Sequence, residues 1–266
     1  RELSTRLTVD KTKIYACEAP IRMGWVYDVA SSMNEALKEK LCYPSFKPQM
    51  SRYVVRGEGM LSQIKRGDIL LSYPYESMEP FLRLIREAAR DPQVISIKIT
   101  IYRLAKKAKL VEYLCEAAER GKEVVVLIEL RARFDEQNNI DWSERLEEAG
   151  CTILYGFDED KVHSKICLLT YRDHQGVRYV TQIGTGNYNE KTAELYTDLS
   201  LMTEDQGIGA DGAKFFENMA VGKLKGEYKH LWVAPYGLKP RLLAMIEKEM
   251  EKGEKEIGRA SCRERV

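Results

Sequence analysis

The stretch Lys161-Val-His163-Ser-Lys165 decides how the rest of the chain is interpreted. Interpreted as part of a strand, it places the imidazole of His163 and the ammonium of Lys165 on one face, because side chains two residues apart in a strand point the same way. A histidine can act as a nucleophile, and a lysine can hold anionic oxygens. This pair is therefore the first candidate for a catalytic site.

A β-hairpin is predicted directly after this pair. The run 166–170 is apolar enough for a buried strand, Asp173-His-Gln-Gly176 is typical of a turn, and 177–183 would be the return strand. The hairpin would bring Gly184-Thr-Gly-Asn187 back beside His163. An imidazole, an ammonium, a glycine-rich backbone turn and an amide are together suited to attack a phosphorus centre and hold its oxygens.

A structural interpretation of the histidine stays open beside the catalytic one. A single histidine is more often a packed or surface side chain than a nucleophile. The chain has three histidines. His174 lies in the predicted turn and His230 stands among aromatic and basic neighbours, so both are interpreted as structural or solvent-facing. His163 alone has a lysine at strand spacing and a Gly/Asn turn downstream.

The composition excludes several classes of protein. The chain has 266 residues with a formal net charge of +1, so nothing draws it as a whole to nucleic acid or to an anionic membrane. No apolar run approaches the roughly 20 residues of a membrane span, and no signal peptide is visible. The chain does not begin with Met, and we expect it to be a fragment.

The cysteines predict a reducing environment. The six cysteines form no Cys-x-x-Cys pair and show no zinc-ligand spacing. Cys115, Cys151 and Cys167 fall within apolar patterns and are expected to be reduced core residues. The resulting expectation is a cytoplasmic protein.

An alternation of strands and helices predicts the fold class. Strands are predicted at 94–102, 123–130 and 151–155, and helices at 81–90, 110–120 and 141–149. The strand at 123–130 is almost entirely apolar, as buried parallel strands tend to be. This order of elements predicts an α/β domain with a mainly parallel sheet flanked by helices.

The two ends of the chain are less regular. Before residue 50 we expect short strands at 7–9 and 13–16, a helix at 25–40 and a proline-rich connector. After the Gly/Asn turn the pattern predicts, in order, a strand at 199–202, a helix at 208–220, a strand at 229–235 and an amphipathic helix at 240–250. Residues 258–266 have no strand or helix pattern and are interpreted as an artefactual tail.

Arginines follow two of the predicted strands. Arg103 follows the first, and Arg131 and Arg133 follow the second. In open α/β sheets, ligands bind at the carboxyl ends of strands, and guanidinium groups suit bidentate contacts to phosphate. Arg103 and Arg133 are therefore candidate anion-binding residues, although a solvated surface arginine is the commoner case for either one alone. Arg131 is ambiguous, because alternation places it on the same face as Arg133.

At these residues the chain resembles the long, histidine-phosphorylated family of bacterial polyphosphate kinases, a family with a phospholipase-D-like fold. The resemblance covers about residues 65–220. The matching segments, in order, are Tyr73-Pro-Tyr-Glu-Ser77, Ile101-Tyr-Arg103, Glu129-Leu-Arg-Ala-Arg-Phe-Asp135, Lys161-Val-His-Ser-Lys165, Gly184-Thr-Gly-Asn-Tyr-Asn189 and Lys191-Thr-Ala-Glu-Leu-Tyr-Thr-Asp198.

The resemblance implies a domain organisation. Residues 1–49 would end a preceding head or middle domain, 50–227 would form the first phospholipase-D-like catalytic domain, and 228–257 would begin a truncated second one. The full-length protein is expected to be a homo-oligomer that binds no nucleic acid and has no integral membrane segment. It would lie in the cytoplasm, or at a membrane within a polyphosphate-synthesising complex.

The resemblance also implies a reaction, ATP + polyphosphate(n) ⇌ ADP + polyphosphate(n+1), with Mg²⁺ as cofactor. His163 matches the residue that is phosphorylated in turnover. Arg103 and Arg133 match a magnesium–phosphate site, where they should hold phosphate oxygens because an arginine cannot ligate a cation. Tyr196 matches a nucleotide-contacting tyrosine. Lys165 and Asn187 match positions that steady the phosphoryl oxygens.

Two departures and two rival interpretations accompany this match. Thr170 stands where the phospholipase pattern has Asp, which favours a kinase over a phosphodiesterase, and the acidic loop Asp158-Glu-Asp160 should repel polyphosphate. One rival is a phospholipase-D-like nuclease or phosphodiesterase, which would have no use for Leu130-Arg-Ala-Arg133. The other is an inactive fragment that only binds phosphate-rich polymers. Phosphorylation of His163 by ATP would distinguish the kinase from both.

Overall fold

The structure is a computed structural model that describes residues 6, 8–13, 15, 17–44, 46–102, 104, 108–129, 136–157 and 160–255, and only the backbone of 11, 136–138 and 254–255. The chain divides into two compact units, residues 1–46 and 47–266. Each unit is described by itself below.

The first unit holds short helices and no strand among its described residues. A 3-10 turn η1 spans Lys11–Lys13, and two helices follow, α2 (Trp25–Ser32) and α3 (Glu35–Leu41). The single helix expected at 25–40 is broken because Met33 is extended. Asn34 then caps the second helix by accepting the backbone N–H of Leu37. The strands expected at 7–9 and 13–16 are wrong for the described residues of those ranges.

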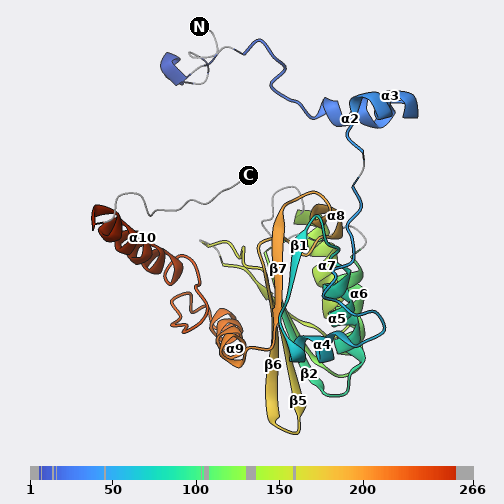
Figure 1. The fold of residues 1–266 in the computed structure, drawn as a ribbon, viewed down its shortest axis with the longest axis vertical. Coiled ribbons are helices and arrows are strands. Elements are labelled where there is room, and N and C mark those ends of the chain that lie inside the picture. Colours follow the sequence, from blue (N-terminus) through green and yellow to red (C-terminus); the bar gives the residue numbers. More distant parts are fainter. Residues whose placement is uncertain are drawn as a thin grey trace. The chain divides into compact units, whose positions relative to one another are not determined.

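The second unit is built on a sheet of seven strands among its described residues, flanked by helices (Figure 1). The strand order is β1-β7-β6-β5-β2-β3-β4. The strands are β1 (Ile69–Tyr73), β2 (Val94–Ile101), β3 (Glu123–Ile128), β4 (Thr152–Tyr155), β5 (Ile166–Asp173), β6 (Gly176–Gly184) and β7 (Asp198–Thr203). The helices are α4 (Met60–Arg66), α5 (Glu79–Arg90), α6 (Lys109–Glu119), α7 (Glu136–Glu148), α8 (Glu190–Ala193), α9 (Gln206–Ala220) and α10 (Leu238–Lys255).

The α/β fold class and the mixed sheet are confirmed, but the sheet is not mainly parallel. Only β2, β3 and β4 run parallel, and the other neighbours pair antiparallel. A parallel pair needs a crossover, usually a helix. Helices α6 and α7 supply it between β2, β3 and β4, whereas residues 156–165 carry no helix in their described part. The tight turn at 173–176 then forces β6 to run antiparallel to β5.

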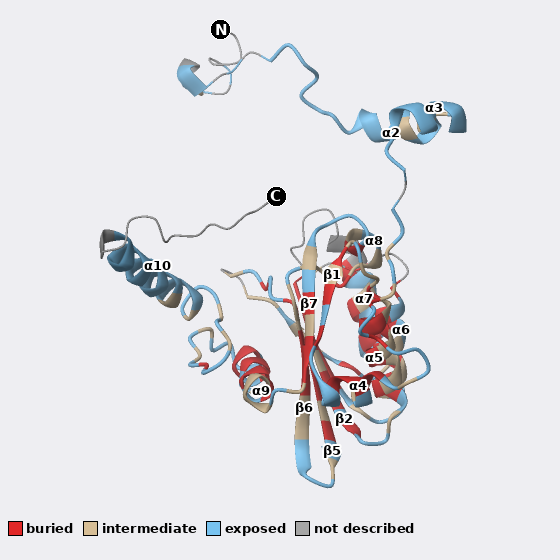
Figure 2. Cartoon of the chain, viewed as in Figure 1, coloured by how far each residue is buried: buried red, intermediate tan, exposed pale blue. Residues whose placement is uncertain are grey.

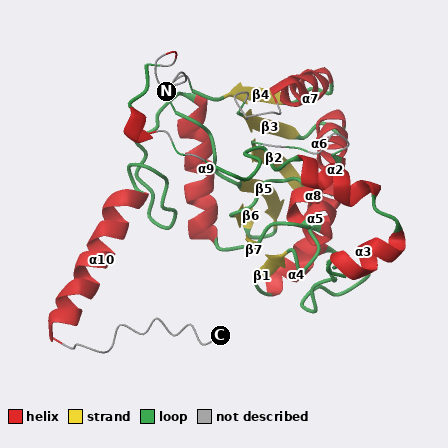
Figure 3. Cartoon of the chain, turned by 90° about the horizontal axis from the view of Figure 1, so that it is seen from above, coloured by secondary structure: helices red, strands yellow, loops and turns green. Residues whose placement is uncertain are grey.

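Alternation along the strands divides the apolar core between the two faces of the sheet (Figures 2 and 3). On β5, Cys167, Leu169 and Tyr171 belong to the core beneath α4, α5 and α6. Their neighbours Ile166 and Leu168 pack with α9 on the other face. A strand buried on both faces has to be apolar throughout. This requirement explains the unbroken apolar run at the start of β5.

The described cysteines of the second unit are buried in this packing. Cys115, Cys151 and Cys167 are free thiols, as expected, whereas Cys17 and Cys42 of the first unit are exposed. Burial raises the pKa of Cys151 to about 12, so this thiol stays protonated and unreactive at neutral pH.

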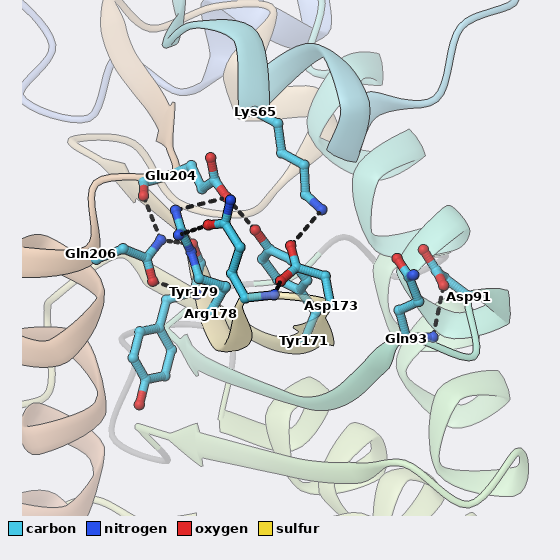
Figure 4. Close-up of polar contacts among 10 residues, drawn as sticks. Lys65, Asp91, Gln93, Tyr171, Asp173, Arg178, Tyr179, Glu204 and Gln206 are labelled. Atoms are coloured by element: carbon cyan, nitrogen blue, oxygen red, sulfur yellow. Dashed lines mark hydrogen bonds and ion pairs between the residues drawn. The ribbon is translucent and has the colours of Figure 1, made fainter.

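The closed end of the β5–β6 hairpin is fixed by polar contacts (Figure 4). The buried Tyr171 hydroxyl donates to the carboxylate of Glu204, which also forms an ion pair of 3.3 Å with Arg178. Away from Glu204, the ammonium of Lys65 on α4 lies 3.4 Å from the carboxylate of Asp173 at the end of β5. These contacts connect the hairpin to α4 and to the β7–α9 link. They hold β5 in place at the end opposite to the candidate nucleophile.

The strand expected at 229–235 is wrong. Residues 221–237 form loops and turns, part of which pack against α9. The carboxylate of Asp211 on α9 accepts the backbone N–H groups of His230 and Leu231, the latter at 2.9 Å. Because this side chain occupies donors that a neighbouring strand would need, the segment follows the helix instead of starting a new sheet.

Two glycines of α9 differ in how closely the helix approaches the sheet at their positions. A Cβ atom on Gly209 would lie 2.3 Å from the Cβ of Tyr179, whereas one on Gly212 would meet nothing nearer than 3.4 Å. We expect Gly209→Ala to lower the free energy of unfolding by about 1–3 kcal/mol through overpacking. Gly212→Ala should be neutral or stabilising by up to about 1 kcal/mol, because alanine favours a helix. Urea unfolding of both variants checks this, and equal shifts would contradict the close approach.

Candidate functional site

The candidate nucleophile lies in an irregular segment, 161–165, that precedes β5 and is not part of a strand. The cause is a contact with the neighbouring strand β2. Backbone pairing of β5 with β2 stops at the pair Ile99–Cys167. Beyond that pair, the hydroxyl of Thr100 bonds to the backbone of the segment in place of a ladder. The histidine and the lysine line one cavity together with the residues between and beside them, so the prediction that their side chains share a strand face stays a prediction.

The side chains of Tyr102, His163 and Lys165 lie close together at this segment. The ring of Tyr102, directly after β2, meets the imidazole of His163 edge to face, with centroids 4.8 Å apart and planes at 76°. The ammonium of Lys165 lies 5.4 Å from the centroid of the same tyrosine ring. It also donates a hydrogen bond to the backbone carbonyl of His163. The tyrosine thus contacts both the candidate nucleophile and its cation.

Burial sets the protonation of the pair. The pKa of His163 is lowered by partial burial and, to a smaller degree, by the positive charge of Lys165. Burial lowers the pKa of Lys165 to about 8, and the carboxylate of Asp198 offsets this only in part. At pH 7 the imidazole is therefore neutral and the ammonium is charged. A neutral imidazole has the lone pair that a nucleophile needs.

A cavity of about 600 Å³ opens beside the pair. Its polar rim includes His163 and Lys165, and its wall is mostly apolar. The apolar wall comes from the sheet, from α9 and from the segment after it, with residues such as Ile166, Ile183, Phe215, Met219, Leu231 and Trp232. The cavity therefore places a small charged group beside a mostly apolar surface, where electrostatic contacts are stronger than in bulk water.

The glycine-rich turn lies against the lysine, as the hairpin predicts. The backbone N–H of Gly184 donates to the carbonyl of Lys165 at 2.9 Å. Farther along, the hydroxyl of Thr185 donates to Asp198 at 2.7 Å, and a Cβ on Gly186 would lie 2.6 Å from that carboxylate. Glycine is required here because Asp198 approaches the backbone so closely.

The other predicted site residues have different outcomes. The side-chain oxygen of Asn187 is buried and has no hydrogen-bond partner among the described residues, and Asn187 does not line the cavity. Tyr196, just beyond α8, is 63% exposed and also lies outside the cavity lining. Arg103 and Arg133 fall outside the described residues, as do Arg131 and most of the acidic loop 158–160.

Sequence reasoning missed Tyr102 and Asp198 as parts of the site. Tyr102 precedes Arg103 at the carboxyl end of β2, so the rule that ligands bind at strand ends pointed to its neighbourhood. Asp198 begins β7, whose pairing with β6 brings it to the glycine turn. That pairing is a long-range contact, and no local pattern in the sequence announces it.

The described residues bear on metal binding and on membrane crossing in two respects. Among them, no three His, Cys, Asp or Glu side chains gather in a way that would hold a metal ion. Within the same ranges, no helix combines the length and the apolar character that crossing a membrane requires.

The fold and the site together define an α/β domain that presents a histidine–lysine pair where an antiparallel strand joins a parallel core. The model of the family "Polyphosphate kinase C-terminal domain 1" matches residues 59–225. The chain belongs to the polyphosphate kinase family.

Relatives agree with this assignment. The chain is 40% identical over 244 residues to the polyphosphate kinase of Staphylococcus haemolyticus, covering 92% of this chain and 34% of that protein. It is 46% identical over 184 residues to the one of Staphylococcus saprophyticus, covering 69% of this chain and 26% of that protein. The crystal structure of polyphosphate kinase from Porphyromonas gingivalis superposes with a TM-score of 0.75 at 32% identity, covering 90% of this chain and 40% of that one. The chain thus spans about a third of the length of the curated relatives it matches.

Proposed function

We propose that this chain forms the first catalytic domain, with flanking segments, of a polyphosphate kinase. The full-length enzyme transfers the γ-phosphate of ATP reversibly to the end of inorganic polyphosphate through a phosphohistidine at His163. Supporting this proposal, beside the family assignment, is one observation: the neutral imidazole of His163 shares a cavity rim with the charged ammonium of Lys165.

In the proposed mechanism, the imidazole of His163 attacks the γ-phosphorus in line. A nitrogen–phosphorus bond forms while the bond to the β,γ-bridging oxygen breaks, and ADP leaves with that oxygen. The ammonium of Lys165, which rests on a backbone carbonyl without substrate, moves to the transferring oxygens and offsets their charge. In the second step the terminal oxygen of polyphosphate takes the phosphoryl group and restores the free imidazole.

In this proposal, Mg²⁺ is bound by the phosphate oxygens of the substrate and not by protein side chains. Among the described residues, the positive charge that acts on the His163 ring is the ammonium of Lys165, which binds anions and cannot ligate a metal. The groups present therefore fit phosphate oxygens, and Mg²⁺ would be held by those oxygens. The metal supplies further charge compensation when bound. Arg103 and Arg133 are proposed to grip the same phosphate, Asn187 to steady the phosphoryl oxygens, and Tyr196 to contact the nucleotide.

The test of this function is labelling. The chain, and separately the full-length protein, is incubated with γ-labelled ATP and Mg²⁺, and the phosphoamino acid is identified. We expect acid-labile, base-stable label on His163 of the full-length protein and its transfer to added polyphosphate, but little or no polyphosphate synthesis by the isolated chain. Polyphosphate binding without label on the full-length protein would instead favour a domain that only binds phosphate-rich polymers. Hydrolysis of phosphodiesters without ATP would favour the phospholipase-D-like alternative.

The arginines give a graded prediction. Arg103→Ala and Arg133→Ala should each lower kcat of the full-length enzyme on the order of a hundredfold or more, because each removes a clamp on the charge of the transferring group. Arg131→Ala should have a much smaller effect and serves as the matched control. Steady-state synthesis assays check this. Equal losses in all three variants would show that the two positions have no special role.

Organisation and location remain proposals. We propose that residues 50–227 form the catalytic domain and 228–257 the start of a second one, and that the full-length protein is a homo-oligomer. The free, buried thiols of the second unit support a reducing compartment such as the cytoplasm.

A further inference from the structure

Two buried side chains hold the backbone around the candidate nucleophile. Thr100 comes from β2 and Glu129 follows β3, and each is 1% exposed. Burying a hydroxyl or a carboxylate is costly unless it makes hydrogen bonds. Both side chains bond to the backbone of residues 162–166, on either side of His163 and Lys165. Neither residue was selected by the sequence patterns.

Thr100 continues the sheet where backbone pairing stops. Its hydroxyl donates to the carbonyl of Ser164 at 2.8 Å and accepts the N–H of Ile166 at 3.1 Å. One side chain thus satisfies a donor and an acceptor that flank Lys165 in the chain. A methyl group in place of this hydroxyl would leave both buried or half-buried backbone groups without their partner.

Glu129 fixes the other side of the nucleophile. Its carboxylate accepts the N–H of Val162, the residue before His163, at 2.9 Å. Gly156 makes room for this contact, since a Cβ there would lie 3.1 Å from the same carboxylate. The side-chain amide of Asn139 then donates to the backbone carbonyls of Glu129, at 2.9 Å, and of Tyr102, at 3.0 Å.

We propose that Thr100 and Glu129 are positioning residues, which clamp the backbone at 162, 164 and 166 so that the His163 imidazole is held against the Tyr102 ring in the place from which it attacks. This inference deepens the proposed function and rests on it. Neither residue contacts the reacting atoms in this role. The clamp matters because a misplacement of about 1 Å in a reacting group can cost on the order of 100-fold in rate.

The chain offers a matched pair of variants for the test. Thr100→Val removes the hydroxyl and keeps the branched shape, whereas Thr100→Ser keeps the hydroxyl. In single-turnover labelling of the full-length protein, we expect Thr100→Val to slow phosphorylation of His163 by on the order of 100-fold. The KM for ATP should change little, and Thr100→Ser should restore most of the rate. Glu129→Gln, which keeps an acceptor oxygen, should likewise retain more rate than Glu129→Leu.

A second measurement needs no activity. Because the 266-residue chain has three histidines, the His163 ring signal in NMR spectra can be assigned with a His163→Gln variant. Thr100→Ser should keep the narrow line and lowered pKa of the original ring. Thr100→Val should broaden the line and return the pKa toward its ordinary value, as the ring leaves Tyr102. Thermal unfolding of each variant separates this effect from a loss of folding.

The outcomes keep the two hypotheses apart. Absence of label on His163 in the original full-length protein would contradict the proposed function, while the NMR comparison still reports on the clamp. An unchanged ring signal and an unchanged labelling rate in Thr100→Val would overturn the positioning role. Equal rate losses in the Val and Ser variants would also overturn it, because they would assign the effect to packing and not to the hydroxyl.

Discussion

Replacing His163 with alanine is expected to abolish acid-labile phosphorylation and, with it, ATP-dependent synthesis of polyphosphate by the full-length enzyme. The loss should reach on the order of 10⁴-fold or more, as removal of a covalent nucleophile does in other enzymes. The physical reason is that the imidazole is the nucleophile of the first transfer and the leaving group of the second, so both steps need it. Label incorporation and polymer formation are measured side by side, so that a defect in either step is visible.

The other histidines supply the controls for this experiment. His174 sits in the exposed hairpin turn at the far end of β5, and His230 lies in the segment held by Asp211. Neither lines the cavity beside the lysine. His174→Gln and His230→Gln should therefore keep the label. A His163→Ala protein that is still phosphorylated at a near-normal rate would show that the nucleophile is another residue.

The elements of the second unit follow from local patterns, but their arrangement does not. Periodicity predicted β2, β3, β5 and β6, as well as α5 and α9, to within a few residues. The same patterns gave no sign that β5 would pair antiparallel with β2 at the centre of the sheet. An apolar strand buried on both faces has the same composition in either direction, so direction is decided by the connections.

The site shows the same division between local and long-range information. Spacing predicted that His163 and Lys165 lie near each other, and both line one cavity with the rest of their segment. It did not predict that both would contact Tyr102, which comes from another strand. It also treated 161–165 as a strand, because nothing local shows that the hydroxyl of Thr100 replaces the backbone ladder at this point.

Replacing Lys165 with methionine is expected to lower the rate of His163 phosphorylation by on the order of 10³-fold, since it removes the charge that offsets the transferring oxygens beside a mostly apolar wall. Methionine is close to lysine in length, so the apolar packing of this buried side chain is largely kept. The ammonium has no carboxylate at hydrogen-bond distance in the described residues; it donates instead to a backbone carbonyl. Its removal therefore leaves no buried carboxylate that had relied on it as a direct partner.

The pH dependence of kcat/KM tests Lys165 separately, because loss of its proton should lower the rate as pH rises, whereas loss of the His163 proton should raise it. For the original enzyme, kcat/KM should rise with pH as His163 loses its proton. This rise should occur below the pH of an ordinary imidazole titration, because the pKa of the ring is lowered. The value of kcat/KM should fall again as pH rises through about 8, where Lys165 loses its charge. In Lys165→Met the alkaline fall should vanish. The acid limb should also move to higher pH, because the charge that lowers the pKa of His163 is gone.

Lys165→Arg is the matched control for these limbs. An arginine stays protonated throughout the range, so the alkaline fall of kcat/KM should vanish while the acid limb remains where it was. The plateau value of kcat/KM should be lower, because a guanidinium does not fit the place of an ammonium. Titration of ATP itself affects all three proteins alike and cancels in the comparison. An alkaline limb that persists near pH 8 in the methionine variant would assign that titration to a different group and remove Lys165 from the mechanism.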